Sequence, residues 1–190
     1  MRSYRPPSIG SPRVADQATH GLIAFLARRR VGLGFVTAVA AALIARPTWE
    51  SWRIGLLVAL VGEAVRIWAA GHLEKGREVT RSGPYRWTAH PLYVGSSVLA
   101  LGVVIASHSI VVGVLATLYM GTTITAAVRS EEAFLRRTFG AAYDEYRRSA
   151  GHAMDRPFSA ARAMRNREYR AVIGLAIGFG FLALKLVLPI

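Results

Sequence analysis

Residues 91–128, "PLYVGSSVLALGVVIASHSIVVGVLATLYMGTTITAAV", contain two apolar runs separated only by Ser107-His108-Ser109. The runs, 91–106 and 110–128, approach the length of about 20 apolar residues that a helix needs to cross a membrane. A connector of three residues leaves room only for a turn. The stretch therefore predicts a tight antiparallel hairpin of two membrane-spanning helices.

Three further apolar runs lie outside this hairpin, at 31–45, 54–73 and 171–190. The runs 31–45 and 91–106 are short, but each can borrow a flanking turn, and long arginine side chains can reach back to the interface. The mean hydropathy of +0.32 reflects these long runs. We expect an all-α, polytopic membrane protein with about five transmembrane helices.

Positive charge is distributed unevenly between the two sides that these spans define. Of the 24 Lys and Arg residues, twenty lie in 1–30, 74–90 and 129–170, and two lie in the connectors on the other side. Cytoplasmic segments of membrane proteins are enriched in Lys and Arg. The pattern predicts an integral protein of the cytoplasmic membrane with its N-terminus inside and its C-terminus outside. It also explains the net charge of +13 without a nucleic-acid partner.

The sequence suggests two parts, a basic cytoplasmic segment over residues 1–30 and a membrane domain over 31–190. The first segment is rich in Arg, Ser and Pro and is expected to be disordered rather than a signal peptide. The chain has no cysteine, which excludes disulfides, thiolate metal ligands and a cysteine nucleophile. We expect no metal site.

Two polar stretches flank the hairpin. "SGPYRWTAHPLYVG", residues 82–95, opens the third span, and "VRSEEAFLRRTFGAAYDEYRR", residues 128–148, leaves the fourth. Because the hairpin is short, both must lie at the same membrane face. Two clusters of polar and aromatic residues that are distant in sequence but adjacent in space indicate a candidate site.

Each cluster also has a structural explanation. Tyr85, Trp87 and Tyr93 could form an interfacial aromatic belt, and Pro91 is a good first residue of a helix. Residues 129–148 carry apolar side chains at helical spacing, which is typical of an amphipathic helix docked on the cytoplasmic membrane surface. Glu131 and Glu132 are adjacent on that helix, so we expect at most one of them to face a site.

Several residues within the spans also have two readings. Glu63 and Arg66, one turn apart, are either functional groups at membrane depth or a self-compensating ion pair. Lys185 is expected to snorkel to the outer interface. The spacing of Gly174 and Gly178 fits close helix packing, including a homodimer through the last span.

In order along the chain, the motifs resemble those of integral-membrane methyltransferases related to isoprenylcysteine carboxyl methyltransferase and phospholipid N-methyltransferases. The resemblance covers roughly residues 57–158, and the last span, 171–190, lies outside it. The matching motifs are Gly83-Pro84-Tyr85, His90-Pro91-Leu92-Tyr93-Val94-Gly95, Glu131-Glu132, Phe139-Gly140-Ala141-Ala142-Tyr143-Asp144-Glu145-Tyr146 and Arg156-Pro157. The family often has Arg before His-Pro, where this chain has Ala89.

The resemblance implies S-adenosylmethionine as methyl donor and a lipidic or hydrophobic acceptor, such as an isoprenylcysteine carboxylate or a phospholipid amine. The residues it places around the donor are Val79, Tyr85, His90, Pro91, Tyr93 and Glu131. His90 and Glu132 are candidates to assist deprotonation of an amine acceptor. Arg129 is a candidate to hold an anionic acceptor.

Two other functions remain open from the sequence. Membrane sterol and steroid reductases, which use NADPH, share a related His-Pro-x-Tyr hairpin. They usually carry an acidic residue soon after its glycine, where this chain has Ser96 and Ser97. A non-enzymatic membrane scaffold would need only the turns, the aromatic belt and the docking helix.

Overall fold

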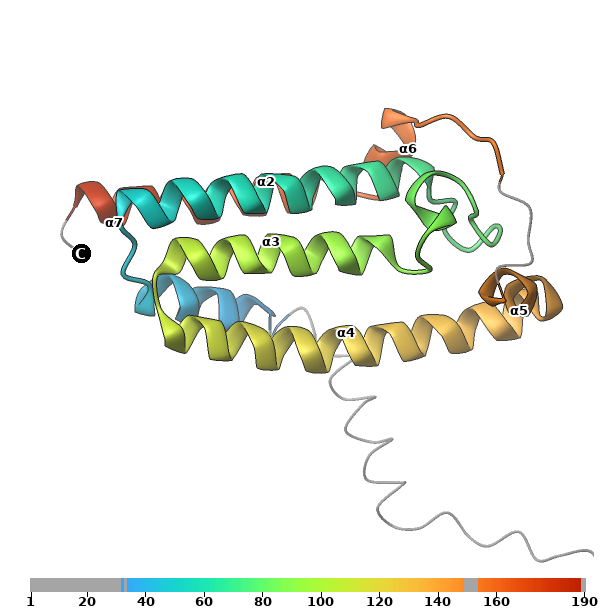
Figure 1. Cartoon of the computed structure of the whole chain (residues 1–190), viewed down its shortest axis with the longest axis horizontal. Helices are drawn as coiled ribbons and strands as arrows, with labels where there is room; N and C mark the ends of the chain where they lie inside the picture. Colours follow the sequence, from blue (N-terminus) through green and yellow to red (C-terminus); the bar gives the residue numbers. More distant parts are fainter. Residues whose placement is uncertain (1–31, 33, 149–153, 189–190) are drawn as a thin grey trace, which may run out of the picture.

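The computed structural model describes residues 32, 34–148 and 154–188, and every regular element within them is helical (Figure 1). The predicted disordered segment, residues 1–30, lies wholly outside the described residues. The elements are a helix over Gly34–Ile44, α2 (Trp49–His72), the 3₁₀ turn η1 (Gly83–Arg86), α3 (Pro91–Ser107), α4 (Ile110–Phe139), α5 (Ala141–Arg147), α6 (Ala160–Arg165) and α7 (Tyr169–Val187).

Three of these helices, α2, α4 and α7, are long and apolar enough to cross a membrane. The helix over Gly34–Ile44 and α3 are apolar but shorter. With 17 residues, α3 rises about 26 Å, which is slightly less than a hydrocarbon core of about 30 Å. The structure thus confirms an all-helical chain with long apolar helices and does not confirm the count of five spans.

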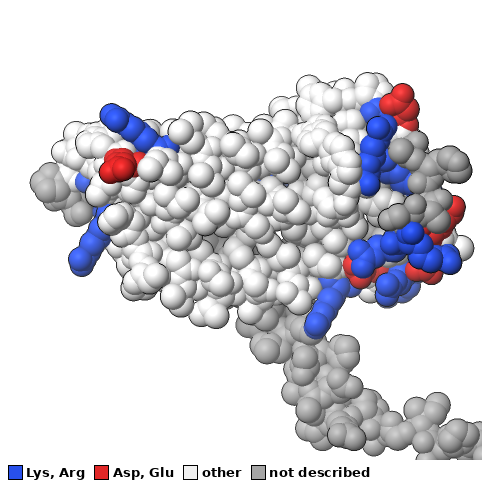
Figure 2. Space-filling model, viewed as in Figure 1, with Lys and Arg blue, Asp and Glu red and all other residues white. Residues whose placement is uncertain are grey.

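Charged side chains in Figure 2 gather at the two ends of the molecule and leave the middle of the visible face free of charge. One of these ends carries η1, α5 and α6, and the other carries the turn between α3 and α4 (Figure 1). An uncharged band between charged ends is the surface that a bilayer requires of a protein embedded in it.

The predicted hairpin of α3 and α4 is present, and its connector consists of His108 and Ser109 (Figure 1). His108 adopts a left-handed conformation with φ 46°, which reverses the chain. The principal partner of α3 is nevertheless α2, because glycines let these helices approach closely. A Cβ on Gly55 would lie 2.5 Å from the backbone nitrogen of Ala106, and one on Gly102 would lie 2.5 Å from that of Ala59.

The fourth helix does not end at the membrane exit. α4 runs for 30 residues to Phe139, Gly140 then breaks it with φ 46°, and α5 follows. The separate amphipathic helix expected over 129–148 is therefore divided between the end of α4 and α5. The more buried side of this region includes Leu135, Tyr143 and Tyr146, which line a cavity. Leu135 and Tyr146, two of the residues at helical spacing, thus face this cavity.

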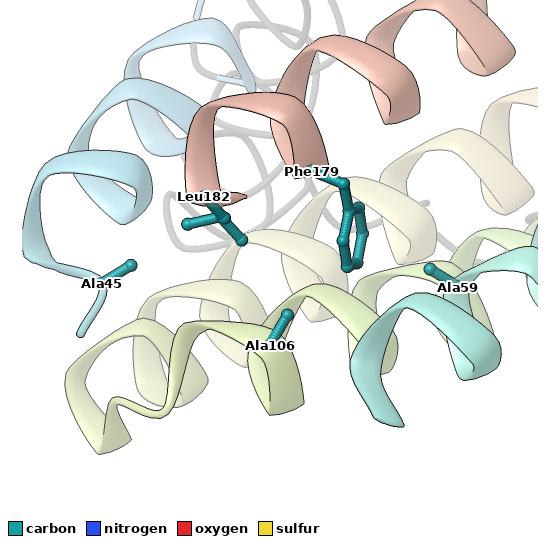
Figure 3. Close-up of a cluster of buried hydrophobic side chains, with 5 residues drawn as sticks. All are labelled: Ala45, Ala59, Ala106, Phe179 and Leu182. Atoms are coloured by element: carbon teal, nitrogen blue, oxygen red, sulfur yellow. The ribbon is translucent and has the colours of Figure 1, made fainter. Parts of the chain in front are cut away.

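The segment after residue 153 returns to α2. The side-chain amide of Asn166 donates hydrogen bonds to the carbonyls of Ala70 and Leu73, at 2.8 and 2.9 Å, and so satisfies carbonyls at the end of α2. α7 then packs along α2, where the Trp52 indole donates a 2.9 Å hydrogen bond to the Phe179 carbonyl. The buried cluster in Figure 3 joins α7 to α2, to α3 and to the end of the helix over Gly34–Ile44: Ala45, Ala59, Ala106, Phe179 and Leu182.

Lys185, which is expected to snorkel, has defined hydrogen-bond partners within the chain. Its Nζ donates hydrogen bonds of 3.1, 3.0 and 2.8 Å to the carbonyls of Ala42, Leu43 and Ala45. These carbonyls lie at the C-terminal end of the helix over Gly34–Ile44, where backbone acceptors lack partners within the helix. Lys185 therefore caps that helix and ties it to α7.

Candidate active site

A cavity of about 390 Å³ lies between the loop after α2, the start of α3 and the α4–α5 region. Its lining residues come from three separate segments of the chain, 73–80, 85–93 and 127–146. This volume is typical of a small-molecule site. The hairpin of α3 and α4 brings the second and third segments together, as the sequence predicts.

All residues predicted to surround a methyl donor line this cavity, namely Val79, Tyr85, His90, Pro91, Tyr93 and Glu131. They come from all three segments. Pro91 is the first residue of α3, and His90 is its N-cap residue. The fixed φ of the proline suits the first turn of a helix and so fixes where the His90 side chain leaves the backbone.

His90 lies between the two adjacent carboxylates. Its Nε2 is 3.4 Å from Glu132 Oε1, and its Nδ1 is 3.8 Å from Glu131 Oε2. Glu131 lines the cavity and Glu132 does not, which agrees with the expectation that one of the pair faces the site. Glu132 nevertheless reaches the other nitrogen of the same ring, and its Oε1 also lies 3.5 Å from Arg147 Nη2.

Arg129 is not brought to the cavity. Its side chain is exposed on α4 and is absent from the cavity lining. Successive residues of an α-helix are about 100° apart, so a residue two positions before Glu131 points to nearly the opposite side of the helix. The geometry gives no support to the predicted role of Arg129 in holding an acceptor.

Tyr146 supports the wall of the cavity formed by η1. Its hydroxyl donates to the carbonyls of Tyr85 and Thr88, at 2.8 and 3.3 Å, and its side chain lines the cavity. Burial raises the pKa of Tyr146 to about 12, so its hydroxyl stays protonated and remains a hydrogen-bond donor at neutral pH. α5 and η1, which are distant in sequence, are thereby fixed to one another.

Tyr143 lies one turn before Tyr146 and is fully buried in the wall of the same cavity. Sequence reasoning assigned neither tyrosine a role in the site. Their spacing of three residues, which places both on one side of a helix, was the available signal.

Two further carboxylates line the cavity on the loop after α2, and both are paired with arginines. Glu78 Oε1 lies 2.6 Å from Arg156 Nη1, and Glu74 Oε1 accepts a 2.8 Å hydrogen bond from Arg162 Nε. This hydrogen bond lowers the pKa of Glu74. The segment that carries the Arg156-Pro157 motif thus holds the loop in place from outside the cavity.

Glu63 and Arg66 form part of a larger buried cluster. Arg66 Nε is 3.5 Å from Glu63 Oε2, Arg66 Nη2 is 2.7 Å from Glu168 Oε1, and Arg66 also donates to the Ser96 hydroxyl. The pair is therefore not simply self-compensating along one helix, because Glu168 belongs to the segment that precedes α7.

A second cavity, of about 410 Å³, lies beside this cluster between the helix over Gly34–Ile44, α3, α4 and α7. Its lining is almost entirely apolar, with Arg66, Ser96 and Ser107 as exceptions. Gly174 and Gly178 line it, and a Cβ on either would meet nothing within 4 Å. Within the described residues these glycines therefore border a cavity.

Comparison with known proteins identifies a family for this chain. The family model described as "Phospholipid methyltransferase" matches residues 35–142, which include most of the cavity wall but not α7. No solved structure shows significant similarity to the chain.

Three relatives illustrate the similarity. "Nickel-cobalt-cadmium resistance protein NccN" of Alcaligenes xylosoxydans xylosoxydans is 32% identical over 73% of this chain and 70% of its own length. "Cobalt-zinc-cadmium resistance protein CzcN" of Cupriavidus metallidurans is 28% identical over 68% of this chain and 65% of its own. "Probable protein-S-isoprenylcysteine O-methyltransferase" of Oryza sativa subsp. indica is 29% identical over 52% of this chain and 58% of its own length. With a family model that matches more than half of it, this integral membrane chain belongs to the phospholipid methyltransferase family.

Proposed function

We propose that the protein is an S-adenosylmethionine-dependent methyltransferase that acts on a lipidic or hydrophobic acceptor at the cytoplasmic face of the membrane. The observation that carries this proposal is the convergence of the six predicted donor-binding residues, from three segments, on one cavity of about 390 Å³.

The chemistry of the lining suits this donor. When bound, S-adenosylmethionine supplies an electrophilic methyl group on a sulfonium, together with an ammonium, a carboxylate, ribose hydroxyls and an adenine ring. The Glu131 carboxylate can accept hydrogen bonds from an ammonium or from hydroxyls. The rings of Tyr85 and Tyr93 offer faces for stacking or for contact with a cation. His90 Nδ1 is buried and makes no hydrogen bond among the described residues, with Glu131 Oε2 3.8 Å away, so it can take a ligand atom as its hydrogen-bond partner.

The residues of the chain would contribute mainly by binding, orientation and the exclusion of water. Methyl transfer needs two reactants aligned and shielded, and alignment alone can supply several kcal/mol. Pro91, Leu92, Phe134 and Leu135 make part of the cavity apolar. If the acceptor is an amine, His90 could take up its proton, with Glu132 orienting and stabilising the imidazolium through Nε2.

The second cavity supports a hydrophobic acceptor. It approaches the first along α3, because Tyr93 lines the first cavity and Ser96 lines the second. An apolar chain held there would place its polar end within about one helical turn of the donor-binding residues. An isoprenylcysteine carboxylate, a phospholipid amine and similar compounds all fit this description.

The sidedness follows from the charge distribution. The cavity lies at the end of the bundle that carries α5 and α6, and the segments at this end hold most of the twenty Lys and Arg residues assigned to the inner side. A donor made in the cytoplasm could then enter from water while the acceptor remains in the bilayer.

Calorimetric titration of S-adenosylhomocysteine, the demethylated donor, into the detergent-purified protein tests the proposal. We expect micromolar binding that is weakened in His90→Ala and Glu131→Ala and unchanged in Glu145→Ala, which removes an exposed carboxylate outside the cavity. NADPH should give no signal. If S-adenosylhomocysteine does not bind to the folded protein, the proposal is refuted. Binding of NADPH in its place would favour a reductase.

A further inference from the structure

The hydroxyl of Tyr143 is a buried polar group without a hydrogen-bond partner. The residue is 0% exposed, and its hydroxyl makes no hydrogen bond within the described part of the chain. Leaving a buried donor unpaired costs about 1–3 kcal/mol, so each such group in a folded protein calls for an explanation.

The position of Tyr143 suggests what that explanation is. Its side chain forms part of the wall of the 390 Å³ cavity, on α5, which Tyr146 fixes to η1. His90 Nδ1, a second buried atom without a hydrogen bond, belongs to another wall of the same cavity. Two unpaired polar atoms on separate walls of one cavity indicate that a ligand completes both.

The neighbouring charges determine which role the hydroxyl can play. Burial, followed by the negative charges of Glu132 and Glu131, raises the pKa of Tyr143, while Arg147 and Arg136 oppose this effect. The hydroxyl is therefore protonated at neutral pH and can donate a hydrogen bond. The lining carboxylates only accept hydrogen bonds when ionised, so they cannot pair with a ligand oxygen that needs a donor, such as a carboxylate oxygen.

We propose that the Tyr143 hydroxyl donates a hydrogen bond to an oxygen of the bound methyl donor, either its carboxylate or a ribose hydroxyl. This inference rests on the proposed function and adds a binding residue to it. Tyr146, its neighbour, has a different role, because its hydroxyl is already occupied by two backbone carbonyls.

The test compares Tyr143→Phe with Tyr146→Phe, since each change removes one hydroxyl and keeps the ring. For Tyr143→Phe we expect S-adenosylhomocysteine to bind about tenfold more weakly, which corresponds to about 1.4 kcal/mol. The melting temperature of the ligand-free protein should stay equal or rise, because an unpaired buried hydroxyl is lost. For Tyr146→Phe the ligand-free melting temperature should fall, because the single O–H donor that two backbone carbonyls share is lost.

Methylthioadenosine, which keeps the ribose but lacks the amino-acid carboxylate, separates the two possible oxygens. If Tyr143→Phe weakens the binding of S-adenosylhomocysteine only, the hydroxyl pairs with the carboxylate. If it weakens the binding of both S-adenosylhomocysteine and methylthioadenosine, the hydroxyl pairs with the ribose. Equal binding of both ligands by Tyr143→Phe and the wild type would overturn the assignment of Tyr143. A lower ligand-free melting temperature for this variant would also overturn it, because the hydroxyl would then have a partner in the protein. If the wild type itself binds neither ligand, the proposed function fails.

Discussion

The close contact between α2 and α3 makes a quantitative prediction about Gly102. A Cβ at this position would lie 2.5 Å from the backbone nitrogen of Ala59 and 2.5 Å from the carbonyl oxygen of Gly55. Ordinary van der Waals contacts of a Cβ begin near 3.4 Å, and the atoms in the way belong to a helix backbone. Gly102→Ala must therefore separate the two helices or displace one along the other.

The magnitude follows from two opposing terms. Overpacking of a tight interface costs typically 1–3 kcal/mol, and the clash with two backbone atoms of α2 places Gly102→Ala near the upper limit. Alanine in place of glycine within a helix gains up to about 1 kcal/mol. The net destabilisation is about 2 kcal/mol, which corresponds to a fall of about 4–8 °C in melting temperature for a chain of this size.

Gly180→Ala is the matched control. Gly180 lies within α7, and a Cβ there meets nothing within 4 Å, so only the gain in helix propensity remains. Thermal unfolding in detergent should therefore move in opposite directions for the two variants. A Gly102→Ala protein as stable as the wild type would refute the close packing of α2 on α3.

Three further predictions concern other parts of the molecule. Lys185→Met should lower the free energy of unfolding by about 1–2 kcal/mol, because three carbonyls at a helix end lose a cationic donor. A denaturant unfolding curve that matches that of the wild type would contradict this. Gly178→Leu should fill the second cavity and reduce methyl transfer to a long-chain acceptor at least tenfold without changing donor binding. Gly180→Leu should leave methyl transfer and donor binding unchanged. If Gly178→Leu instead alters only the oligomeric state, as measured by light scattering, the glycines form a dimer interface. The Arg162–Glu74 hydrogen bond lowers the pKa of Glu74, so its stabilisation is present above the ordinary carboxyl pKa of 4.5 and is lost as the pH falls through the lowered value. The difference in melting temperature between the wild type and Arg162→Met should accordingly shrink on acidification below about pH 4, and a difference independent of pH would show that this carboxylate is not involved.

The candidate site was largely predictable because it depends on connectivity. The short connector at Ser107-His108-Ser109 forces the polar stretches on either side of the hairpin to one end, whatever the details of packing. The residues that the resemblance names on these two stretches, Tyr85, His90, Pro91, Tyr93 and Glu131, therefore meet at one cavity, which Val79 also lines. Arg129 does not share this position, because its place on the helix, two residues from Glu131, turns it away.

The helix pairing was less accessible from the sequence. Apolar runs identify helices but do not say which of them touch, since almost any face of such a helix can be buried. Gly55 and Gly62 on α2, and Gly95 and Gly102 on α3, are each seven residues apart and so lie on one face. This repeat was a usable signal for the α2–α3 contact.

Other features depend on contacts between residues far apart in sequence. Arg66 pairs with Glu168 across about a hundred residues, and Lys185 caps a helix more than 140 residues earlier. No local sequence pattern predicts such partners. The same holds for Tyr143, whose unpaired hydroxyl becomes apparent only when every neighbouring donor and acceptor has been located.

An experimental structure of the protein with S-adenosylhomocysteine tests the central claim most directly. The account predicts ligand density in the 390 Å³ cavity, in contact with His90, Glu131 and Tyr143. An empty cavity at saturating ligand, or density bound elsewhere on the chain, would contradict it.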